Sequence, residues 1–189
     1  MTEISTTKLP DVKIITPKKF GDDRGFFSEV WNRETLKSVG IKDDFVQDNH
    51  AFSAEKGTIR GLHYQLSPKA QGKLVRVTRG AVMDVAVDIR VGSPTFGEHV
   101  AVELSADNWR QLWVPAGFAH GYCTLTDDVE FLYKVTNDYS PAHEQGIIWN
   151  DPALGIDWGM PIDNIQLSEK DKILPSLADQ INLFTYGDI

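Results

Sequence analysis

Two stretches decide the fold, GTIRGLHYQ at residues 57–65 and PAGFAH at residues 115–120. They belong to a pattern that runs from residue 11 to about residue 150, in which short runs rich in valine, isoleucine and aromatic residues are separated by glycine and proline. Helical periodicity is scarce, so the pattern predicts an all-β domain. The expected strands are residues 13–15, 25–31, 45–52, 58–65, 74–78, 82–90, 98–104, 111–114, 121–125 and 129–135.

Closely spaced strands with few helices favour a sandwich or jelly-roll barrel with room for a ligand. Residues 32–39 read as a short helix, and Ser168 with Asp171 resembles a capping box that opens a C-terminal helical segment over about 168–182. The chain lacks internal repeats and low-complexity linkers, and its length suits one domain. We therefore expect a single domain over 1–189 with a barrel core at about 25–150.

The composition limits the classes of function. Nineteen basic and 27 acidic residues give a net charge of −8, which disfavours a general nucleic-acid binder. The chain lacks a signal-peptide core and a run approaching the roughly 20 apolar residues that span a bilayer. The single cysteine, Cys123, cannot form an internal disulfide. A cytoplasmic protein that contacts neither membrane nor nucleic acid is expected.

The two opening stretches have the spacing of the two sequence signatures of the cupin barrel. Metal-binding cupins carry His-x-His and a later glutamate in the first signature, but here Gln65 replaces the second histidine and no glutamate follows at the expected distance. His63 and His120 alone make a poor site for a divalent ion, so no metal is expected. With an ordinary pKa of about 6.5, a metal-free histidine can move protons near neutral pH. A hydrogen-bonded core histidine is the plain alternative for His63.

Strand alternation places two further residues in the barrel. Lys73 shares a strand face with Val75 and Val77, and Tyr133 shares one with Phe131 and Val135. Both side chains are therefore expected to point inward.

Arg60 and His63 differ by an odd number of positions and should face opposite sides of an ideal strand. Gly61 between them offers a bulge or kink that brings them together.

The sequence as a whole resembles the dTDP-4-dehydrorhamnose 3,5-epimerase family from near the N-terminus to about residue 171. Nine matching stretches in the same order make chance agreement implausible. They are FGDDRGFFSE, FVQDNH, RGLHYQ, QGKLVRV, DVAVDIR with SPTFGEHV, QLWVPAGFAHGY, EFLYKVTNDYSP, IIWNDPALGI and LSEKD.

The resemblance implies roles for catalytic residues. His63 would remove a proton from the carbon beside a ketone, Asp171 would orient its imidazole, and Tyr133 would return a proton from the opposite face. Lys73 is the natural cation to stabilise the enolate, and His120 would contact the substrate in the same pocket.

The nucleotide end of the ligand needs other groups, because the chain has no Gly-rich phosphate loop of the Walker or Rossmann type. The resemblance assigns cations to the diphosphate, polar residues to further contacts and one tyrosine to stacking on thymine. The cations are Arg24, Arg60 and Lys170. The polar residues are Glu29, Gln47, Asn49 and Glu144, and the stacking tyrosine is Tyr139. The family commonly has two adjacent tyrosines here, and in this chain the first is Asp138.

Each assignment has a structural alternative. Arg24 and Lys170 could be solvated surface charges, and Lys73 could extend out of a sheet edge. Asp171 could simply support a helix start, and Tyr133 could be a core tyrosine whose hydroxyl is satisfied.

The resemblance implies conversion of dTDP-4-dehydro-6-deoxy-D-glucose to dTDP-4-dehydro-L-rhamnose, without metal or organic cofactor, by a homodimer that exchanges N-terminal strand pairing. Three alternatives stay open: an epimerase that inverts one carbon or acts on a related sugar nucleotide, a non-catalytic sugar-nucleotide sensor, and a metal-dependent cupin enzyme.

Overall fold

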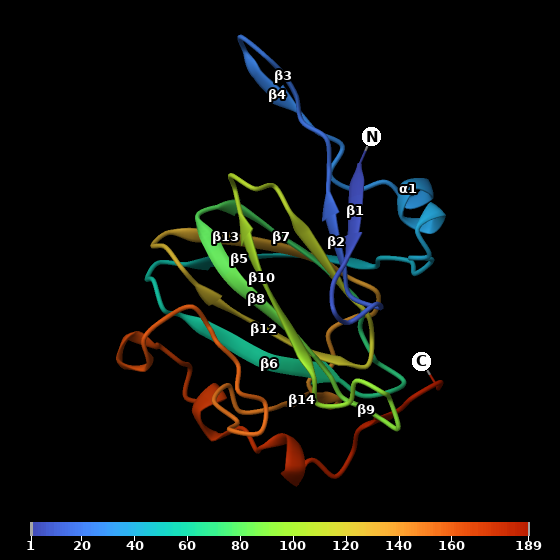
Figure 1. Ribbon diagram of the computed structural model, residues 1–189, viewed down its shortest axis with the longest axis vertical. Helices are drawn as coiled ribbons and strands as arrows, with labels where there is room; N and C mark the ends of the chain where they lie inside the picture. Colours follow the sequence, from blue (N-terminus) through green and yellow to red (C-terminus); the bar gives the residue numbers. More distant parts are fainter. Residues whose placement is uncertain (1, 189) are drawn as a thin grey trace.

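The computed structural model describes residues 2–188 and contains two antiparallel sheets packed face to face (Figure 1). One has six strands in the order β1-β2-β11-β7-β13-β5, and the other has five in the order β10-β8-β12-β6-β14. Neighbouring strands are mostly distant in sequence, which is the connectivity of a jelly roll. The all-β prediction is confirmed.

The strand bounds agree with the predicted runs at most positions. The six-stranded sheet consists of β1 (Glu3–Thr6), β2 (Lys13–Thr16), β11 (Gln111–Val114), β7 (Lys73–Arg79), β13 (Val129–Val135) and β5 (Gln47–Ser53). The five-stranded sheet consists of β10 (His99–Ser105), β8 (Ala81–Asp88), β12 (Phe118–Thr124), β6 (Ile59–Gln65) and β14 (Glu144–Gly146). The short pairs are β3 (Phe20–Asp22) with β4 (Gly25–Phe27), and β9 (Arg90–Val91) with β15 (Phe184–Thr185).

The core between the sheets follows strand alternation. Val75 and Val77 of β7 and Phe131 of β13 are fully buried in it, together with Tyr122 of β12. Tyr133 packs against the same cluster. The predicted inward faces of β7 and β13 are therefore correct.

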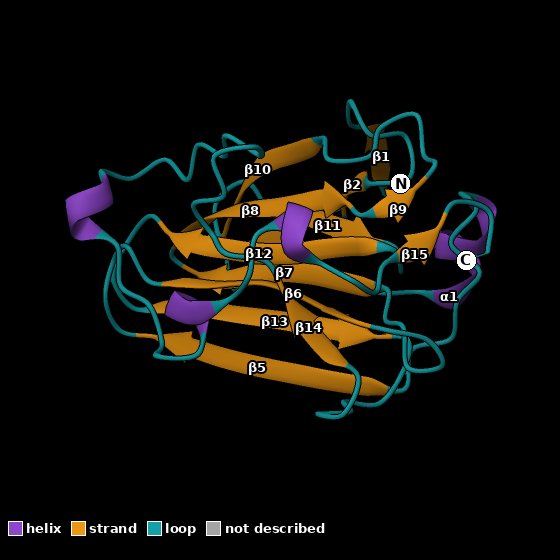
Figure 2. Ribbon diagram, turned by 90° about the horizontal axis from the view of Figure 1, so that it is seen from below, coloured by secondary structure: helices purple, strands orange, loops and turns teal. Residues whose placement is uncertain are grey.

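The outer face of each sheet is also covered. Helix α1 (Arg33–Ser38) buries Leu36 against the six-stranded sheet, and the Asn32 side chain caps its first turn by accepting from Thr35 N at 3.1 Å. This confirms the predicted helix. The C-terminal segment crosses the five-stranded sheet (Figure 2), where Trp158, Leu177 and Phe184 are buried.

Two predicted elements are wrong. The strand expected over 25–31 ends at Phe27, because β4 pairs only with β3 in a hairpin that projects from the body (Figure 1). The C-terminal helical segment expected over about 168–182 holds only two separate 3-10 helices, η2 (Asp171–Ile173) and η3 (Leu177–Asp179). Pro175 explains the break, since the residue before a proline avoids helical geometry and Leu174 is extended with ψ 144°.

The Gly61 bulge is present. His63 of β6 pairs with His120 and Arg60 pairs with Tyr122, so three steps along β6 match two along β12. Gly61 has φ +122°, and a Cβ there would lie 2.6 Å from the Gly121 Cα. The bulge thus requires glycine and turns Arg60 toward the side of the sheet that carries His63.

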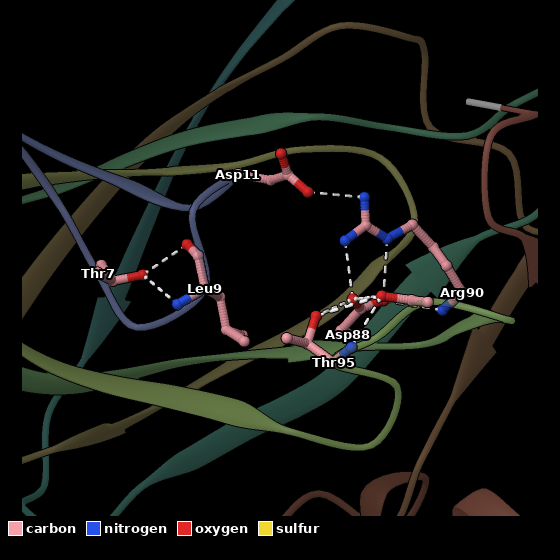
Figure 3. A network of polar contacts seen from close by, with 7 residues as sticks. Thr7, Leu9, Asp11, Asp88, Arg90 and Thr95 are labelled. Carbon is pink, nitrogen blue, oxygen red and sulfur yellow. Dashed lines mark hydrogen bonds and ion pairs between the residues drawn. The ribbon is translucent and has the colours of Figure 1, made fainter.

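An ion cluster, in which Asp88 and Arg90 are buried and Asp11 is exposed, ties the start of the chain to the end of β8. Figure 3 shows Arg90 between Asp88 and Asp11, with Nη2 2.7 Å from Asp88 and Nη1 2.9 Å from Asp11. Ser93 and Thr95 hydroxyls donate to Asp88 at 2.6 and 2.7 Å. Burial opposes ionisation of Asp88, but the hydrogen bonds from Arg90, Ser93 and Thr95 hold its pKa below its ordinary value. The cluster is therefore a satisfied ion pair that fastens the Asp11 loop.

Candidate active site

A cavity of about 520 Å³ opens between the two sheets and is lined by all four predicted catalytic residues. The lining includes side chains from β6, β7, β12 and β13 and from the segment 166–171. The predicted site residues along it are Arg60, His63, Lys73, His120, Tyr133, Lys170 and Asp171. Residues separated by more than 100 positions in the sequence thus line the same cavity, as the resemblance implies.

His63 and Asp171 form a hydrogen-bonded pair, with His63 Nε2 2.7 Å from Asp171 Oδ1. Burial opposes ionisation of Asp171, but the bond and charge of His63, with Ser168 and the Gly61 N–H, hold its pKa below the ordinary value. An ionised carboxylate only accepts, so the neutral imidazole carries its hydrogen on Nε2 and keeps a free lone pair on Nδ1. The pair has the composition of an oriented general base.

Asp171 also explains why the capping-box interpretation is partly right. Its backbone N–H donates to Ser168 Oγ at 3.2 Å, as in a helix cap, while its side chain turns to His63. The turn therefore aims the carboxylate instead of starting a long helix.

Tyr133 and Lys73 approach the cavity from the six-stranded sheet, whereas His63 comes from the five-stranded one. Burial raises the pKa of the Tyr133 phenol, with Arg60 opposing this shift, so the phenol is protonated at neutral pH. Desolvation lowers the pKa of Lys73 from 10.5 to about 8, although the charges of Asp84 and Glu144 oppose it. The cavity thus has a proton donor and a cation opposite its base.

His120 is held by Asp84, which the sequence analysis missed. The His120 Nε2 lies 3.0 and 3.1 Å from the two Asp84 carboxylate oxygens, and Asp84 is 0% exposed. Burial lowers the pKa of His120 and raises that of Asp84, and each partner opposes the shift of the other. A signal was present, because an acidic residue inside the apolar run AVMDVAV predicts a buried, paired charge.

A second group of predicted residues forms a chain of hydrogen bonds beside the cavity. Lys170 Nζ bonds Glu144 at 2.5 Å, and the Tyr139 hydroxyl donates to the same Glu144 oxygen at 2.8 Å. The Tyr139 N–H donates to Gln47 Oε1 at 3.3 Å, and Gln47 Nε2 donates to Asn49 at 2.8 Å. Five of the residues that were predicted to bind the nucleotide end of the ligand are thereby connected by hydrogen bonds.

Arg24 and Glu29 do not lie in or beside the cavity. Arg24 lies at the turn of the β3–β4 hairpin, where its side chain is 89% exposed and pairs with Asp22. Glu29 lines a different hollow with Lys18 and Phe20. In the single chain these two residues are outside the cavity.

No group of three or more His, Cys, Asp or Glu side chains within residues 2–188 is placed to hold a metal ion. Each remaining cupin position has another partner: His63 bonds Asp171, His120 bonds Asp84, and the Gln65 amide bonds backbone groups. The metal-free interpretation stays a prediction.

Comparison with known proteins gives one consistent result. A family model described as dTDP-4-dehydrorhamnose 3,5-epimerase matches residues 6–179. A dTDP-4-dehydrorhamnose 3,5-epimerase of Shigella flexneri is 58% identical over 87% of this chain and 90% of its own length.

Solved structures agree. A dTDP-6-deoxy-D-glucose-3,5-epimerase of Legionella pneumophila, in complex with dTDP-4-keto-L-rhamnose, has a TM-score of 0.93 and 48% identity over 98% of this chain and 99% of that one. A dTDP-4-dehydrorhamnose 3,5-epimerase of Bacillus anthracis, with TDP and pyrophosphate bound, has a TM-score of 0.89 and 50% identity over 93% and 99%. With its fold and most of its length matched, the chain belongs to the dTDP-4-dehydrorhamnose 3,5-epimerase family.

Proposed function

We propose that this chain inverts carbons 3 and 5 of dTDP-4-dehydro-6-deoxy-D-glucose to give dTDP-4-dehydro-L-rhamnose, a step of dTDP-L-rhamnose biosynthesis. The observation that carries the proposal is the placement of His63 and Tyr133, which enter one cavity from opposite sheets. Inversion needs two proton carriers on opposite faces of the sugar, because one base returning its proton to the same face restores the starting stereoisomer.

The proposed mechanism moves one proton at a time. His63, oriented by Asp171 at 2.7 Å, takes the proton from the carbon beside the ketone and becomes an imidazolium. The electron pair moves to the carbon 4 oxygen, where the Lys73 ammonium stabilises the enolate. Tyr133 then donates its phenol proton to the carbon from the opposite face, and exchange with solvent resets both residues. Positioned proton transfer contributes roughly 100-fold to 10,000-fold and a directed charge about 3 kcal/mol.

His120 and the nucleotide end complete the proposed site. His120, held by Asp84 at 3.0 Å, supports the ketone oxygen beside Lys73. Arg60 and Lys170 contact the diphosphate with charge-assisted hydrogen bonds. Gln47, Asn49 and Glu144 supply further polar contacts, and Tyr139 stacks on thymine.

Deuterium labelling tests the proposal. The purified chain is incubated with dTDP-4-dehydro-6-deoxy-D-glucose in deuterated water, and the product is examined by NMR. Label at carbons 3 and 5 is expected, because Tyr133 regains its proton from solvent after each inversion. Label at one carbon supports a monofunctional epimerase instead, and an unlabelled sugar overturns the proposal.

The same preparation tests the metal-free proposal. Protein purified without chelator is analysed for metals, and its activity is measured before and after dialysis against EDTA. We expect no loss of activity. Stoichiometric iron, zinc or nickel that activity requires would show that a metal-dependent cupin enzyme is the correct interpretation.

We also propose a homodimer in which Arg24 and Glu29 reach the partner's cavity. Support comes from the β3–β4 hairpin, which extends away from the body with Phe20, Phe26 and Phe27 exposed (Figure 1). Strand β1 at the sheet edge has one unpaired side, which can pair with a second copy. No helix within residues 2–188 is long and apolar enough to cross a membrane, and the cytoplasmic location stays a prediction.

A further inference from the structure

Gln65 stands where metal-binding cupins carry the second histidine of the first signature, yet its side chain neither lines the cavity nor is left without partners. It is 4% exposed, and its amide nitrogen donates to Lys69 O at 2.6 Å and to Asp138 O at 3.1 Å. Its amide oxygen accepts from Ser140 N at 2.8 Å. Both N–H groups and the oxygen are therefore engaged with backbone groups of the surrounding loops.

Two of these bonds flank Tyr139. The Gln65 amide holds the carbonyl of the residue before Tyr139 and the N–H of the residue after it. The Tyr139 side chain itself is 55% exposed, so packing contributes little to its orientation. The direction of the ring therefore depends on how its backbone is held.

The hydroxyl end of Tyr139 is held by the strand that pairs with the Gln65 strand. Gln65 of β6 lies directly opposite Glu144 of β14, and Glu144 accepts the Tyr139 hydroxyl at 2.8 Å. Two cross-strand neighbours thus fix one tyrosine, one through its backbone and one through its phenol. A ring fixed in this way loses little conformational entropy when a flat ligand stacks on it.

We infer that Gln65 is a positioning residue for nucleotide recognition, which sets the stacking ring of Tyr139 by clamping the backbone on both sides of it. The inference rests on the proposed function, in which Tyr139 stacks on thymine. It predicts an effect on binding and not on chemistry, because the Gln65 side chain bonds only backbone groups and does not line the cavity that holds His63, Lys73 and Tyr133.

The test compares Gln65→Leu with a matched control, Gln71→Leu. Gln71 Nε2 donates to Asn137 O at 2.6 Å and so anchors the same loop without flanking Tyr139. Since stacking on an aromatic ring contributes substantially to base binding, Gln65→Leu is expected to raise the Kd for dTDP and the KM by about tenfold with kcat within about twofold. Gln71→Leu should change the Kd by less than about twofold. Calorimetry with dTDP and steady-state kinetics give the two readouts.

A double-mutant cycle shows whether Gln65 acts through Tyr139. In a Tyr139→Ala background, Gln65→Leu should weaken dTDP binding no further. Equal loss in both backgrounds, or unchanged binding by Gln65→Leu in the wild-type background, overturns the inference. If Gln65→Leu does not fold, Gln65→Glu keeps the acceptor for Ser140 N, loses both donated bonds and serves the same comparison. Failure of the wild-type chain to bind dTDP refutes the proposed function instead.

Discussion

At the scale of single residues, the base and the acid of the proposed reaction are distinguished by their surroundings. Asp171 directs the imidazole of His63, whereas burial keeps the Tyr133 phenol protonated. His63→Ala and Tyr133→Phe are each expected to lower kcat by about 100-fold to 10,000-fold while dTDP affinity changes little. Kinetics and calorimetry on the same preparations measure both quantities. If His63→Ala turns over at the wild-type rate, His63 is not the general base.

The proposed role of Lys73 predicts a high-pH limit for the reaction. Because burial lowers its pKa to about 8, the ammonium and the enolate stabilisation proposed for it should be lost as the pH rises through about 8. Asp84 raises that pKa, so Asp84→Asn is expected to move the descending limb of kcat/KM to lower pH. The measurement is a pH profile of kcat/KM for both proteins.

The control for this pH prediction is His120→Asn, which keeps the Asp84 carboxyl group and a hydrogen-bond donor beside it. Its descending limb should stay near the wild-type position even if its turnover falls. If the descending limb of the kcat/KM profile does not move in Asp84→Asn, a group other than Lys73 causes it.

How much of the site could be predicted depended on the kind of signal that each residue carries. Lys73 and Tyr133 could be predicted because strand alternation and the family resemblance agree on them, and His63 because the cupin signature and the resemblance agree on it. Asp84 stands in the apolar run AVMDVAV, which predicts a paired charge, but its partner His120 lies on another strand, so the identity of the partner shows only in three dimensions. Arg24 was assigned by resemblance, but the fold of one chain leaves it far from the cavity lining.

At the scale of elements, the bulge in β6 decides which residues share the cavity. A Cβ at Gly61 would lie 2.6 Å from Gly121 Cα and 2.7 Å from His120 O, so Gly61→Ala must shift β6 against β12. We expect a loss of about 1–3 kcal/mol in unfolding free energy and a marked fall in turnover, as Arg60 and His63 move apart. Urea unfolding and kinetics measure the two effects.

Gly92→Ala is the control that separates the strain of a positive φ from the steric clash expected at Gly61. Gly92 also has a positive φ, +85°, but nothing lies within 4 Å of its added Cβ. This variant should keep wild-type turnover. Equal turnover in Gly61→Ala would show that the bulge does not position the site.

The ion cluster around Arg90 has a structural role only. Asp88→Ala leaves a buried guanidinium with Asp11 as its remaining carboxylate, and we expect a loss of about 3 kcal/mol in unfolding free energy. Activity per folded molecule should not change, because the cluster does not line the cavity. Asp44→Ala removes an exposed Arg33 pair and should cost less than about 1 kcal/mol. Similar losses for both variants in urea unfolding would contradict the argument.

The elements differ in how far local sequence determines them. The 32–39 helix was predictable because its Asn32 cap is a local signal, and strands 111–114 and 129–135 match their predicted bounds. The C-terminal segment was mispredicted because the Ser168 and Asp171 signal is real but serves the pair with His63. Pro175 then ends the turn, and this proline is a local signal against a helix over the whole segment.

At the scale of the whole molecule, one copy of the chain does not bring all the predicted ligand-binding residues to its cavity. The cavity of one chain holds His63, Tyr133 and Lys73, while Arg24 stands at the tip of a projecting hairpin (Figure 1). If Arg24 binds the diphosphate, as proposed, the hairpin must enter the cavity of another copy. A homodimer with twofold symmetry would complete both sites at once.

Mixed dimers test this exchange. Arg24→Ala and His63→Ala are each expected to be nearly inactive as pure proteins, and they are co-expressed with different tags so that only dimers with one copy of each are isolated. If Arg24 serves the partner's site, each mixed dimer has one site free of both changes, and about half of wild-type activity returns. If Arg24 serves its own chain, every site carries a change and activity stays at the level of the pure variants. Light scattering on the wild-type chain gives the accompanying check, because a monomer at working concentration cannot share its hairpin and would contradict the dimer directly.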